Sequence, residues 1–228
     1  DGELEDLAAS NFIFGRANVG GRPVVASADD FTVRGGAADA ALHRKFVQCE
    51  AMAHEYRLPL IRMIDGTGGG GSVKTLEMIG ATYIPAVHMW SEVVRNLDTV
   101  PVVALALGPT AGLGAARVVA SHYSIMVRGL SQLFAAGPAV AAAIGDTLDR
   151  EELGGVDVHT RNGVVDDEVA SEAEAFARAR HFLSFMPEYV GQPARRAECH
   201  DPADRREEAL LSLVPRDPKQ VYSMRRCM

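Results

Sequence analysis

An uninterrupted apolar run, Val100–Leu107, constrains the fold of this chain more than any other feature of its sequence. A strand that is apolar on both faces is typical of a parallel sheet with helices on each side. The run leads into a glycine-rich turn at Gly108–Gly114, and the small residues of Ala115–Ser121 then predict a short helix. This order predicts an α/β fold in which helix N-terminal amides point into the space beyond the strand.

Other strands and helices alternate along the chain and favour the same fold class. Asn11–Val19 and Arg22–Ser27 are β-rich runs that Gly20-Gly21 joins into a hairpin. We expect further strands at Phe31–Val33, Pro59–Ile64, Tyr123–Val127 and Leu133–Phe134. We expect helices from Asp39 to Tyr56, from Leu76 to about Leu97 with a bend or break at Pro85, at Pro138–Ile144, at Arg150–Leu153, and from the N-cap Ser171 to about Phe185. The alternation predicts a mainly parallel sheet.

Composition is that of an ordinary globular protein with enough residues to bury a full core. The chain has 228 residues, of which 47% are hydrophobic and 23% charged. We expect one large domain over residues 1–187 and a linker or arm over residues 188–228, where Pro, Arg and acidic residues become frequent. The net charge of −7 argues against a nucleic-acid-binding surface.

The cysteines and the apolar runs indicate the kind of compartment. Cys49 falls on the apolar helix face formed by Leu42, Phe46, Cys49, Ala53 and Tyr56, so we expect a buried thiol there. Cys199 and Cys227 are far away and form no CxxC pair, which argues against structural zinc and against a disulfide framework. No signal peptide or membrane-spanning run is visible, so we expect a cytoplasmic protein, or a mitochondrial matrix protein in a eukaryote.

Two glycine turns are the candidate functional site. In the first, Gly112 precedes Leu113, Gly114 and Ala115, whose backbone amides could stabilise an oxyanion as preorganised donors. In the second, Gly35-Gly36-Ala37, a further donor could converge on the same ligand. Tight packing of helix on sheet explains the first turn equally well, and an ordinary turn explains the second slightly better when it is taken alone.

Several familiar sites are absent from the sequence. The cluster of Gly66 and Gly68–Gly71 lacks the Gly-Lys-Ser/Thr triplet of a P-loop, and we interpret Gly68 and Gly69 as part of a flexible wall of the site. Asp65 is either functional or, as we favour, a cap for the loop that follows it. The histidines lack metal-ligand spacing, so we expect neither a metal nor an ATP site in this chain.

One segment makes the sequence resemble a known family. Leu133-Phe-Ala-Ala-Gly-Pro138, Ala142–Asp146 and Glu151–His159 resemble the β-subunit carboxyltransferases of biotin-dependent acyl-CoA carboxylases, which act on propionyl-CoA, acetyl-CoA and methylcrotonyl-CoA. The resemblance extends to Phe31–Gly36, Leu58–Asp65, Asp201–Asp204 and Val221–Met224. It covers nearly the whole chain and corresponds to the amino-terminal half of the family's proteins, so residues 188–228 would lead towards a second crotonase-like half.

The resemblance implies a fold, an activity and a set of site residues. The fold would be a crotonase-like (ClpP/crotonase) spiral of ββα units around a mainly parallel sheet. The enzyme would move a carboxyl group from carboxybiotin to the α-carbon of a short acyl-CoA. Backbone amides would hold the thioester enolate that forms during this transfer. We assign the amides of Gly114, Leu113 and Ala115 to the oxyanion hole for this enolate. Gly36 and Ala37 would form the second side of the hole. The residues that we assign to contacts with the acyl-CoA are Gly35, Gly36, Gly112, Gly68 and Gly69.

The resemblance also implies partners and leaves two alternatives. Biotin would arrive on a carrier domain of a biotin carboxylase and carrier subunit, and the chain would form a homo-oligomer, a hexamer in this family, without metal, nucleic acid or membrane. One alternative is the carboxyltransferase subunit of a biotin-dependent acyl-CoA decarboxylase. The other is a non-catalytic scaffold that keeps the crotonase fold.

Two departures from the family pattern concern the site itself. The family usually has Thr-Ala-Gly-Gly-Ala where this chain has Ala111-Gly-Leu-Gly-Ala115, so Leu113 replaces a glycine. The loop after Asp65 reads Gly-Thr-Gly-Gly-Gly-Gly rather than the family's Ser-containing sequence. We therefore expect Leu113 to reshape the acyl pocket, and we carry over no ligand contact from the loop.

Overall fold

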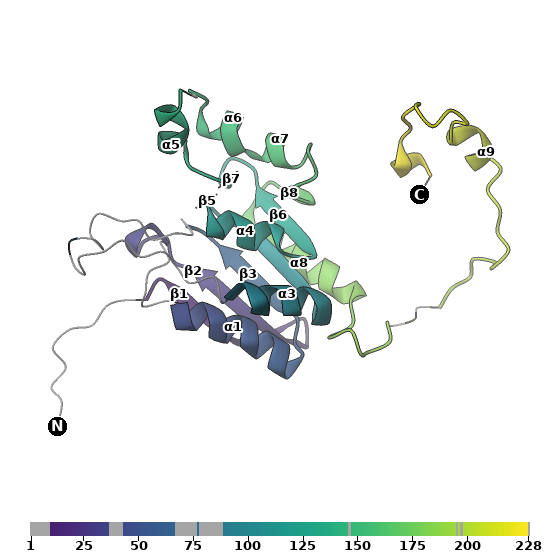
Figure 1. Ribbon diagram of the computed structural model, residues 1–228. Coiled ribbons are helices and arrows are strands. Elements are labelled where there is room, and N and C mark those ends of the chain that lie inside the picture. The colour runs from purple at the N-terminus through teal and green to yellow at the C-terminus, as the bar shows by residue number, and fades with distance from the viewer. Residues whose placement is uncertain are drawn as a thin grey trace. The chain divides into compact units, whose positions relative to one another are not determined.

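The chain divides into two units, which we describe separately. The computed structural model describes residues 10–36, 43–66, 77, 89–145, 147–194, 196 and 198–227 (Figure 1). The two compact units are residues 1–195 and residues 196–228. The first unit contains the sheet, and the second contains α9 (Leu210–Leu213) and η2 (Met224–Arg226). The domain boundary that we expected at residue 187 stays a prediction.

A six-stranded sheet in the order β1-β2-β3-β4-β6-β8 forms the centre of the first unit (Figure 1). The predicted hairpin is confirmed: β1 (Phe12–Val19) and β2 (Arg22–Asp29) pair antiparallel. The remaining strands all pair in parallel and are β3 (Leu60–Ile64), β4 (Val102–Ala106), β6 (Tyr123–Val127) and β8 (Asp167–Val169). The mainly parallel α/β sheet that the sequence predicts is therefore confirmed.

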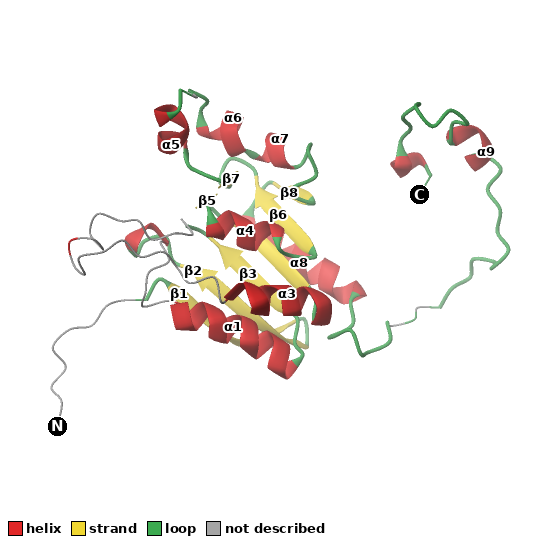
Figure 2. Cartoon of the chain, viewed as in Figure 1, coloured by secondary structure: helices red, strands yellow, loops and turns green. Residues whose placement is uncertain are grey.

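Helices cover both faces of this sheet, which explains why every residue of β4 is buried (Figure 2). One face carries α1 (His43–Tyr56), α3 (Met89–Thr99) and α4 (Leu113–Val119), whose apolar residues pack with Leu60, Ile64, Val102 and Ala104. The other face carries α8 (Glu172–Phe185), which packs on Ile61, Val103, Leu105 and Ile125. Neighbouring residues of one strand point to opposite faces, so each strand contributes to both layers.

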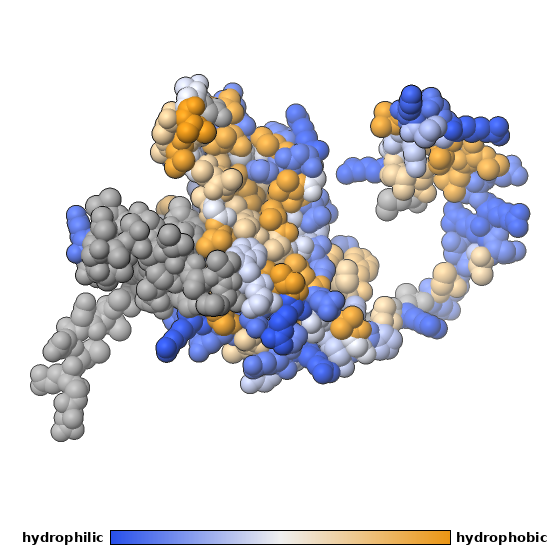
Figure 3. All heavy atoms as spheres, in the orientation of Figure 1, coloured by the Kyte–Doolittle hydropathy of each residue, from blue (hydrophilic) through white to orange (hydrophobic). Residues whose placement is uncertain are grey.

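Shorter elements lie around the carboxyl end of the sheet. β5 (Pro109–Ala111) and β7 (Gln132–Phe134) form a separate two-stranded parallel sheet, so the expected turn at Gly108–Gly114 contains a short strand. The chain then forms α5 (Pro138–Ala143), α6 (Arg150–Gly154) and α7 (Val156–His159). Apolar side chains gather on the exposed surface of α5, for example Val140, which is 57% exposed (Figure 3).

Three expectations require correction. Phe31–Val33 is a turn followed by η1 (Arg34–Gly36), not a strand, because the Asp30 carboxylate accepts the N–H of Thr32 at 2.9 Å and its hydroxyl at 2.6 Å. Tyr56 is 57% exposed at the end of α1 and does not join the buried face. The sequence pattern also missed α7 and β8, which are only four and three residues long.

The predicted starts of α5 and α6 and the predicted N-cap of α8 are confirmed, whereas α4 starts at Leu113, two residues before the predicted Ala115. Ser171 caps α8, since its hydroxyl oxygen accepts the N–H of Glu174 at 3.3 Å. The Glu174 carboxylate accepts the N–H of Ala170 at 3.1 Å, one residue before the cap. The first half of the helix expected at Leu76–Leu97, including its bend at Pro85, lies outside the described residues.

Two other features are absent from the part of the chain that the structure describes. It has no helix that is long and apolar enough to cross a membrane. Within the same residues, no three His, Cys, Asp or Glu side chains are grouped so that they could hold a metal ion.

Cysteine reactivity tests the packing of α1 on the sheet. Cys49 is 1% exposed, and burial raises the pKa of its thiol to about 12, whereas Cys199 is exposed. Because thiolates react and thiols do not, we expect a thiol reagent at pH 8 to label Cys199 in the native protein and Cys49 only after unfolding. Mass spectrometry of labelled peptides before and after denaturation measures this difference. Native labelling of both residues at one rate would contradict the packing.

Candidate functional site

Three glycine turns meet at the carboxyl edge of the sheet. Gly36 follows β2, Gly66 follows β3 and Gly108 follows β4, and these three strands are neighbours in parallel register. The carboxyl ends of neighbouring parallel strands lie at one edge, which is where α/β proteins bind ligands. The sheet therefore brings together turns that lie far apart in the sequence.

The first two turns touch backbone to backbone. A Cβ atom on Gly36 would lie 2.7 Å from the Cα atom of Gly66, and a Cβ on Gly66 would lie 2.6 Å from the Cα of Gly36. Both residues also have positive φ, 65° for Gly36 and 154° for Gly66. Only glycine at both positions permits this approach without strain.

The contact continues towards the turn after β4. The carbonyl of Gly66 accepts the N–H of Ala111 at 3.4 Å, which joins the end of β3 to β5. Gly108 lies against the Asp65 side chain, where a Cβ would come within 2.6 Å of the carboxyl carbon. Gly36, Gly66 and the Gly108–Ala111 segment thus form one continuous patch of backbone.

Gly112 turns the chain from β5 into α4. Its φ of 58° and ψ of −122° form a conformation that favours glycine. Its N–H donates to the carbonyl of Phe134 at 2.9 Å, and its own carbonyl accepts the N–H of Ala116 at 3.0 Å. That is the first helical hydrogen bond, so the N–H groups of Leu113, Gly114 and Ala115 lie ahead of the helical ladder. These are the amides that the sequence assigns to an oxyanion hole.

The predicted site residues differ in how the structure places them. Gly114 and Ala115 are buried at the start of α4, and Leu113 is half-buried. The N–H of Gly36 donates to the carbonyl of Val33 at 3.2 Å and is therefore engaged in its own turn. Gly35, with φ of 61°, belongs to that same turn. Ala37, Gly68 and Gly69 lie outside the described residues.

Two carboxyl groups that the sequence analysis did not pair lie beside the turns. The Asp29 carboxylate contacts the guanidinium of Arg117 at 3.3 Å, and both side chains are 6% exposed. The N–H of Asp65 donates to the Asp29 carboxylate at 3.4 Å. Burial raises the pKa of Asp65, and the negative charge of Asp29 raises it further. The capping role expected for Asp65 concerns a loop outside the described residues.

Arg117 also lies over two aromatic rings of the core. Its guanidinium carbon is 4.6 Å from the ring centre of Phe46 and 5.4 Å from that of Phe12. Such a cation over a ring face is attracted by the ring electrons. Arg117 therefore holds α4 against both β2 and α1.

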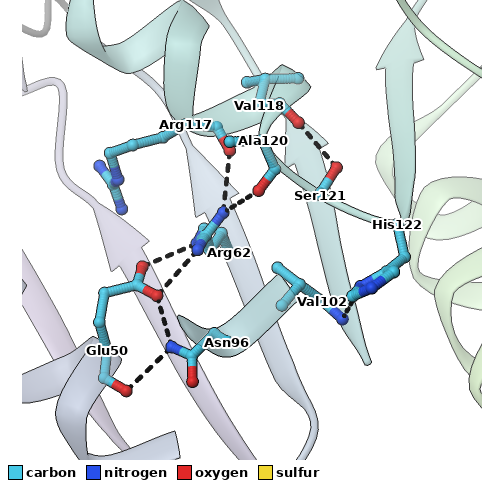
Figure 4. A network of polar contacts seen from close by, with 9 residues as sticks. All are labelled: Glu50, Arg62, Asn96, Val102, Arg117, Val118, Ala120, Ser121 and His122. Carbon is cyan, nitrogen blue, oxygen red and sulfur yellow. Dashed lines mark hydrogen bonds and ion pairs between the residues drawn. The ribbon is translucent and has the colours of Figure 1, made fainter. Parts of the chain in front are cut away.

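A second arginine, Arg62, lies in the middle of β3 and contacts two helices, α1 and α4 (Figure 4). Its guanidinium donates to both carboxylate oxygens of Glu50 on α1, each at 2.8 Å, and to carbonyls at the end of α4. Asn96 on α3 donates to the same carboxylate at 2.8 Å. A charged residue within the apolar run of β3 was the sequence signal for this network, since a buried charge needs a partner.

The segment that carries the family resemblance packs against β7. A Cβ on Gly154 would lie 2.6 Å from the ring of Phe134, and His159 Nε2 lies 2.9 Å from the carbonyl oxygen of Leu133. Because Phe134 also accepts the N–H of Gly112, this packing holds the strand that supports the glycine turn.

Comparison with known proteins places these observations in a family. A model described as the carboxyl transferase domain matches residues 2–228. The mitochondrial propionyl-CoA carboxylase beta chain of Rattus norvegicus is 30% identical over 224 residues, which are 97% of this chain and 40% of that protein. Methylmalonyl-CoA decarboxylase subunit alpha of Veillonella parvula is 28% identical over 225 residues, 98% of this chain and 43% of that protein. The chain thus spans about two fifths of the length of these relatives.

Solved structures of the same kind have a similar fold. Transcarboxylase 12S, with methylmalonyl-coenzyme A and methylmalonic acid bound, has a TM-score of 0.69 at 26% identity over 95% of this chain and 41% of that chain. The beta subunit of geranyl-CoA carboxylase from P. aeruginosa has a TM-score of 0.65 at 26% identity over 95% of this chain and 40% of that one. The crotonase-like α/β fold that the resemblance implied is therefore confirmed.

The contact between Gly36 and Gly66 can be tested with a matched pair of substitutions. Gly35→Ala and Gly36→Ala both place a side chain at positive φ, which costs about 1–2 kcal/mol. Only Gly36→Ala also meets a neighbouring backbone, whereas a Cβ on Gly35 meets nothing within 4 Å. We expect Gly36→Ala to lower the free energy of unfolding by roughly 1–3 kcal/mol more than Gly35→Ala, as measured by urea denaturation. Equal losses would mean that the two turns do not touch.

Proposed function

The chain belongs to the carboxyl transferase domain family, and from this membership we propose that it is the acyl-CoA-binding part of a biotin-dependent acyl-CoA carboxyltransferase. The reaction moves a carboxyl group from carboxybiotin to the α-carbon of a short acyl-CoA. The likeness to propionyl-CoA carboxylase beta chains supports an acyl-CoA substrate. Because the chain spans about two fifths of those relatives, the activity of the whole protein is part of the proposal.

The observation that carries this proposal is the turn from β5 into α4. Gly112 directs the N–H groups of Leu113, Gly114 and Ala115 out of the helical ladder, beside the patch formed by Gly36 and Gly66. When the α-proton leaves, negative charge develops on the thioester oxygen. Backbone donors fixed in advance stabilise that charge without reorganisation at the moment of reaction.

The second glycine turn supplies the other side of the proposed hole. Since the N–H of Gly36 is engaged with Val33, we assign the donor there to Ala37. Gly35, Gly36 and Gly112 leave room for the acyl-CoA to approach the backbone, and we assign Gly68 and Gly69 to the same wall. The side chains of this chain supply no base in the proposal.

Biotin and the remaining partners complete the proposed enzyme. Carboxybiotin supplies the carboxyl group and the base for the α-proton when it is bound, carried on a domain of a partner subunit. A separate biotin carboxylase would use ATP, and a second crotonase-like half would supply the biotin side of the site. We further propose a homo-oligomer, in line with the hexamer assembly named for transcarboxylase 12S, in the cytoplasm or the mitochondrial matrix.

One alternative has support of its own. The likeness to methylmalonyl-CoA decarboxylase subunit alpha favours a subunit that moves the carboxyl group from acyl-CoA to biotin. The same amides would hold the same thioester enolate, so the site does not distinguish the two directions. Neighbouring genes distinguish them: a biotin carboxylase gene favours the carboxylase, and a gene for a membrane pump favours the decarboxylase.

Replacement of Gly114 tests the oxyanion assignment. We expect Gly114→Val, which places a branched side chain beside the proposed donors, to abolish carboxyl transfer in the fully assembled enzyme while the fold remains. Loss of one such donor typically costs on the order of 2.7–4 kcal/mol of transition-state stabilisation. The measurement is the rate of carboxylated acyl-CoA formation, with circular dichroism to confirm folding.

A matched substitution controls for the general effect of valine. Gly15→Val lies on β1, where a Cβ meets nothing within 4 Å, and we expect transfer to continue. Near-normal turnover of Gly114→Val would show that the oxyanion assignment is wrong.

Substitution of Leu113 tests whether this side chain shapes the acyl pocket. Its half-buried side chain stands where the family usually has glycine, next to the amides assigned to the reacting oxygen. If it points towards the acyl group, it favours acetyl and propionyl over longer or branched chains. A misfit of one methylene is worth about 1–3 kcal/mol, so Leu113→Gly should shift the relative kcat/KM tens-fold towards longer acyl-CoA. Unchanged ratios of kcat/KM for acetyl-, propionyl- and longer acyl-CoA in a folded variant would show that Leu113 does not determine acyl specificity.

A further inference from the structure

The buried Arg62 of β3 donates hydrogen bonds to carbonyls at the C-terminal end of α4. The Arg62 side chain is 0% exposed, and its guanidinium donates to the carbonyl of Arg117 at 3.1 Å and to that of Ala120 at 2.6 Å (Figure 4). These carbonyls belong to the last turn of the helix, and carbonyls in a last turn have no N–H partner within the helix. A cation at this end is also attracted by the helix dipole.

Two other helices hold the guanidinium in place. Glu50 of α1 accepts from Nε and Nη2 of Arg62 in a bidentate pair, each bond 2.8 Å long. Asn96 of α3 donates to a Glu50 carboxylate oxygen at 2.8 Å and to the Glu50 carbonyl at 2.9 Å. Since the forked guanidinium fits its partners in one orientation only, α4 is tied to α1 and α3 as well as to β3.

The network lies between two apolar clusters on one face of the sheet. Leu60, on one side of Arg62, packs under α1, and Ile64, on the other side, packs under α4. A well-packed apolar residue in place of a buried ion pair often leaves stability unchanged or raises it. A gain in stability therefore does not explain why a charged residue lies at this position. The fixed orientation that Arg62 imposes on the helices bound to it does explain it.

We propose that Arg62 is a positioning residue for the carboxyl transfer: it fixes α4 by its carbonyl end and so sets where the amides of Leu113–Ala115 lie. With seven residues, α4 is about 10 Å long, so a shift at one end is passed to the other. The inference rests on the proposed function, because it takes those amides to be the donors to the thioester oxygen. Arg62 itself acts through α4 and does not contact the substrate.

Two variants and one control test this role in the full-length protein with its biotin carrier. Arg62→Lys keeps the charge but lacks the fork, and the double variant E50L/R62M removes the pair without leaving an unpaired buried charge. The control is Leu183→Ala, which destabilises the opposite face of the sheet, where Leu183 of α8 packs on the strands at 2% exposure. Each is assayed with propionyl-CoA for kcat and KM, for thermal unfolding, and for amide hydrogen exchange in the peptide of residues 108–120.

We expect the loss to appear in kcat rather than in KM. A displacement of about 1 Å at a positioned group costs up to about 10²-fold in rate, so kcat should fall by that order in E50L/R62M and by less in Arg62→Lys. Exchange in residues 108–120 should become faster in both. Leu183→Ala should keep its kcat and its exchange in that peptide, even where its melting temperature falls as far as that of the Arg62 variants.

The outcomes separate this inference from the proposed function. Wild-type kcat and exchange in a folded E50L/R62M, or an equal loss of kcat in Leu183→Ala, would overturn the positioning role. A wild-type protein that carries out no carboxyl transfer with its partners would overturn the proposed function, and the exchange data would then still report whether Arg62 holds α4.

Discussion

The contact between the backbones of Gly36 and Gly66 determines where a site can form in this protein. Neither the turn after β2 nor the turn after β3 has a side chain at this contact, so the two turns meet main chain to main chain. The hydrogen bond from Ala111 to Gly66 then joins β5 to the same patch, and α4 begins from there. Among the described residues, main-chain atoms of these turns therefore meet at the edge of the sheet, which suits a ligand that is held by amides.

Much of this fold could be predicted from local patterns in the sequence. The β1–β2 hairpin, the buried strand β4 and the N-cap of α8 depend on residues close together in the chain, and their patterns predicted them well. The turn at Phe31–Val33 was missed because one side chain, Asp30, competes with the backbone for the hydrogen bonds of a strand. β8 has only three residues, too few for an alternation to be visible.

The candidate site was predicted in part, for a different reason. Glycines identify turns, so the sequence could locate the turns at Gly36 and Gly112 and predict that they converge, whereas the order of strands that brings them to one edge comes from the structure. The ion pairs beside the site could not be predicted from the sequence in this way. Arg117 reaches Asp29 across 88 positions of sequence, and periodicity indicates only the face on which each residue lies. Which acid meets which arginine is decided by the packing of α4 on the sheet.

The bidentate pair of Arg62 with Glu50 has a consequence for how sequences of this family can diverge. Loss of either partner leaves a charge in the core, which costs about 3–5 kcal/mol and is a large part of the stability of most domains. A lineage can therefore leave this arrangement only by changing both positions within a short interval, or by first acquiring another partner for the charge. Asn96 donates to the same carboxylate but is uncharged, so its loss would remove a hydrogen bond and leave the ion pair in place. Substitutions at Arg62 and Glu50 should accordingly be correlated among relatives, although these residues lie on a strand and a helix that share no local sequence.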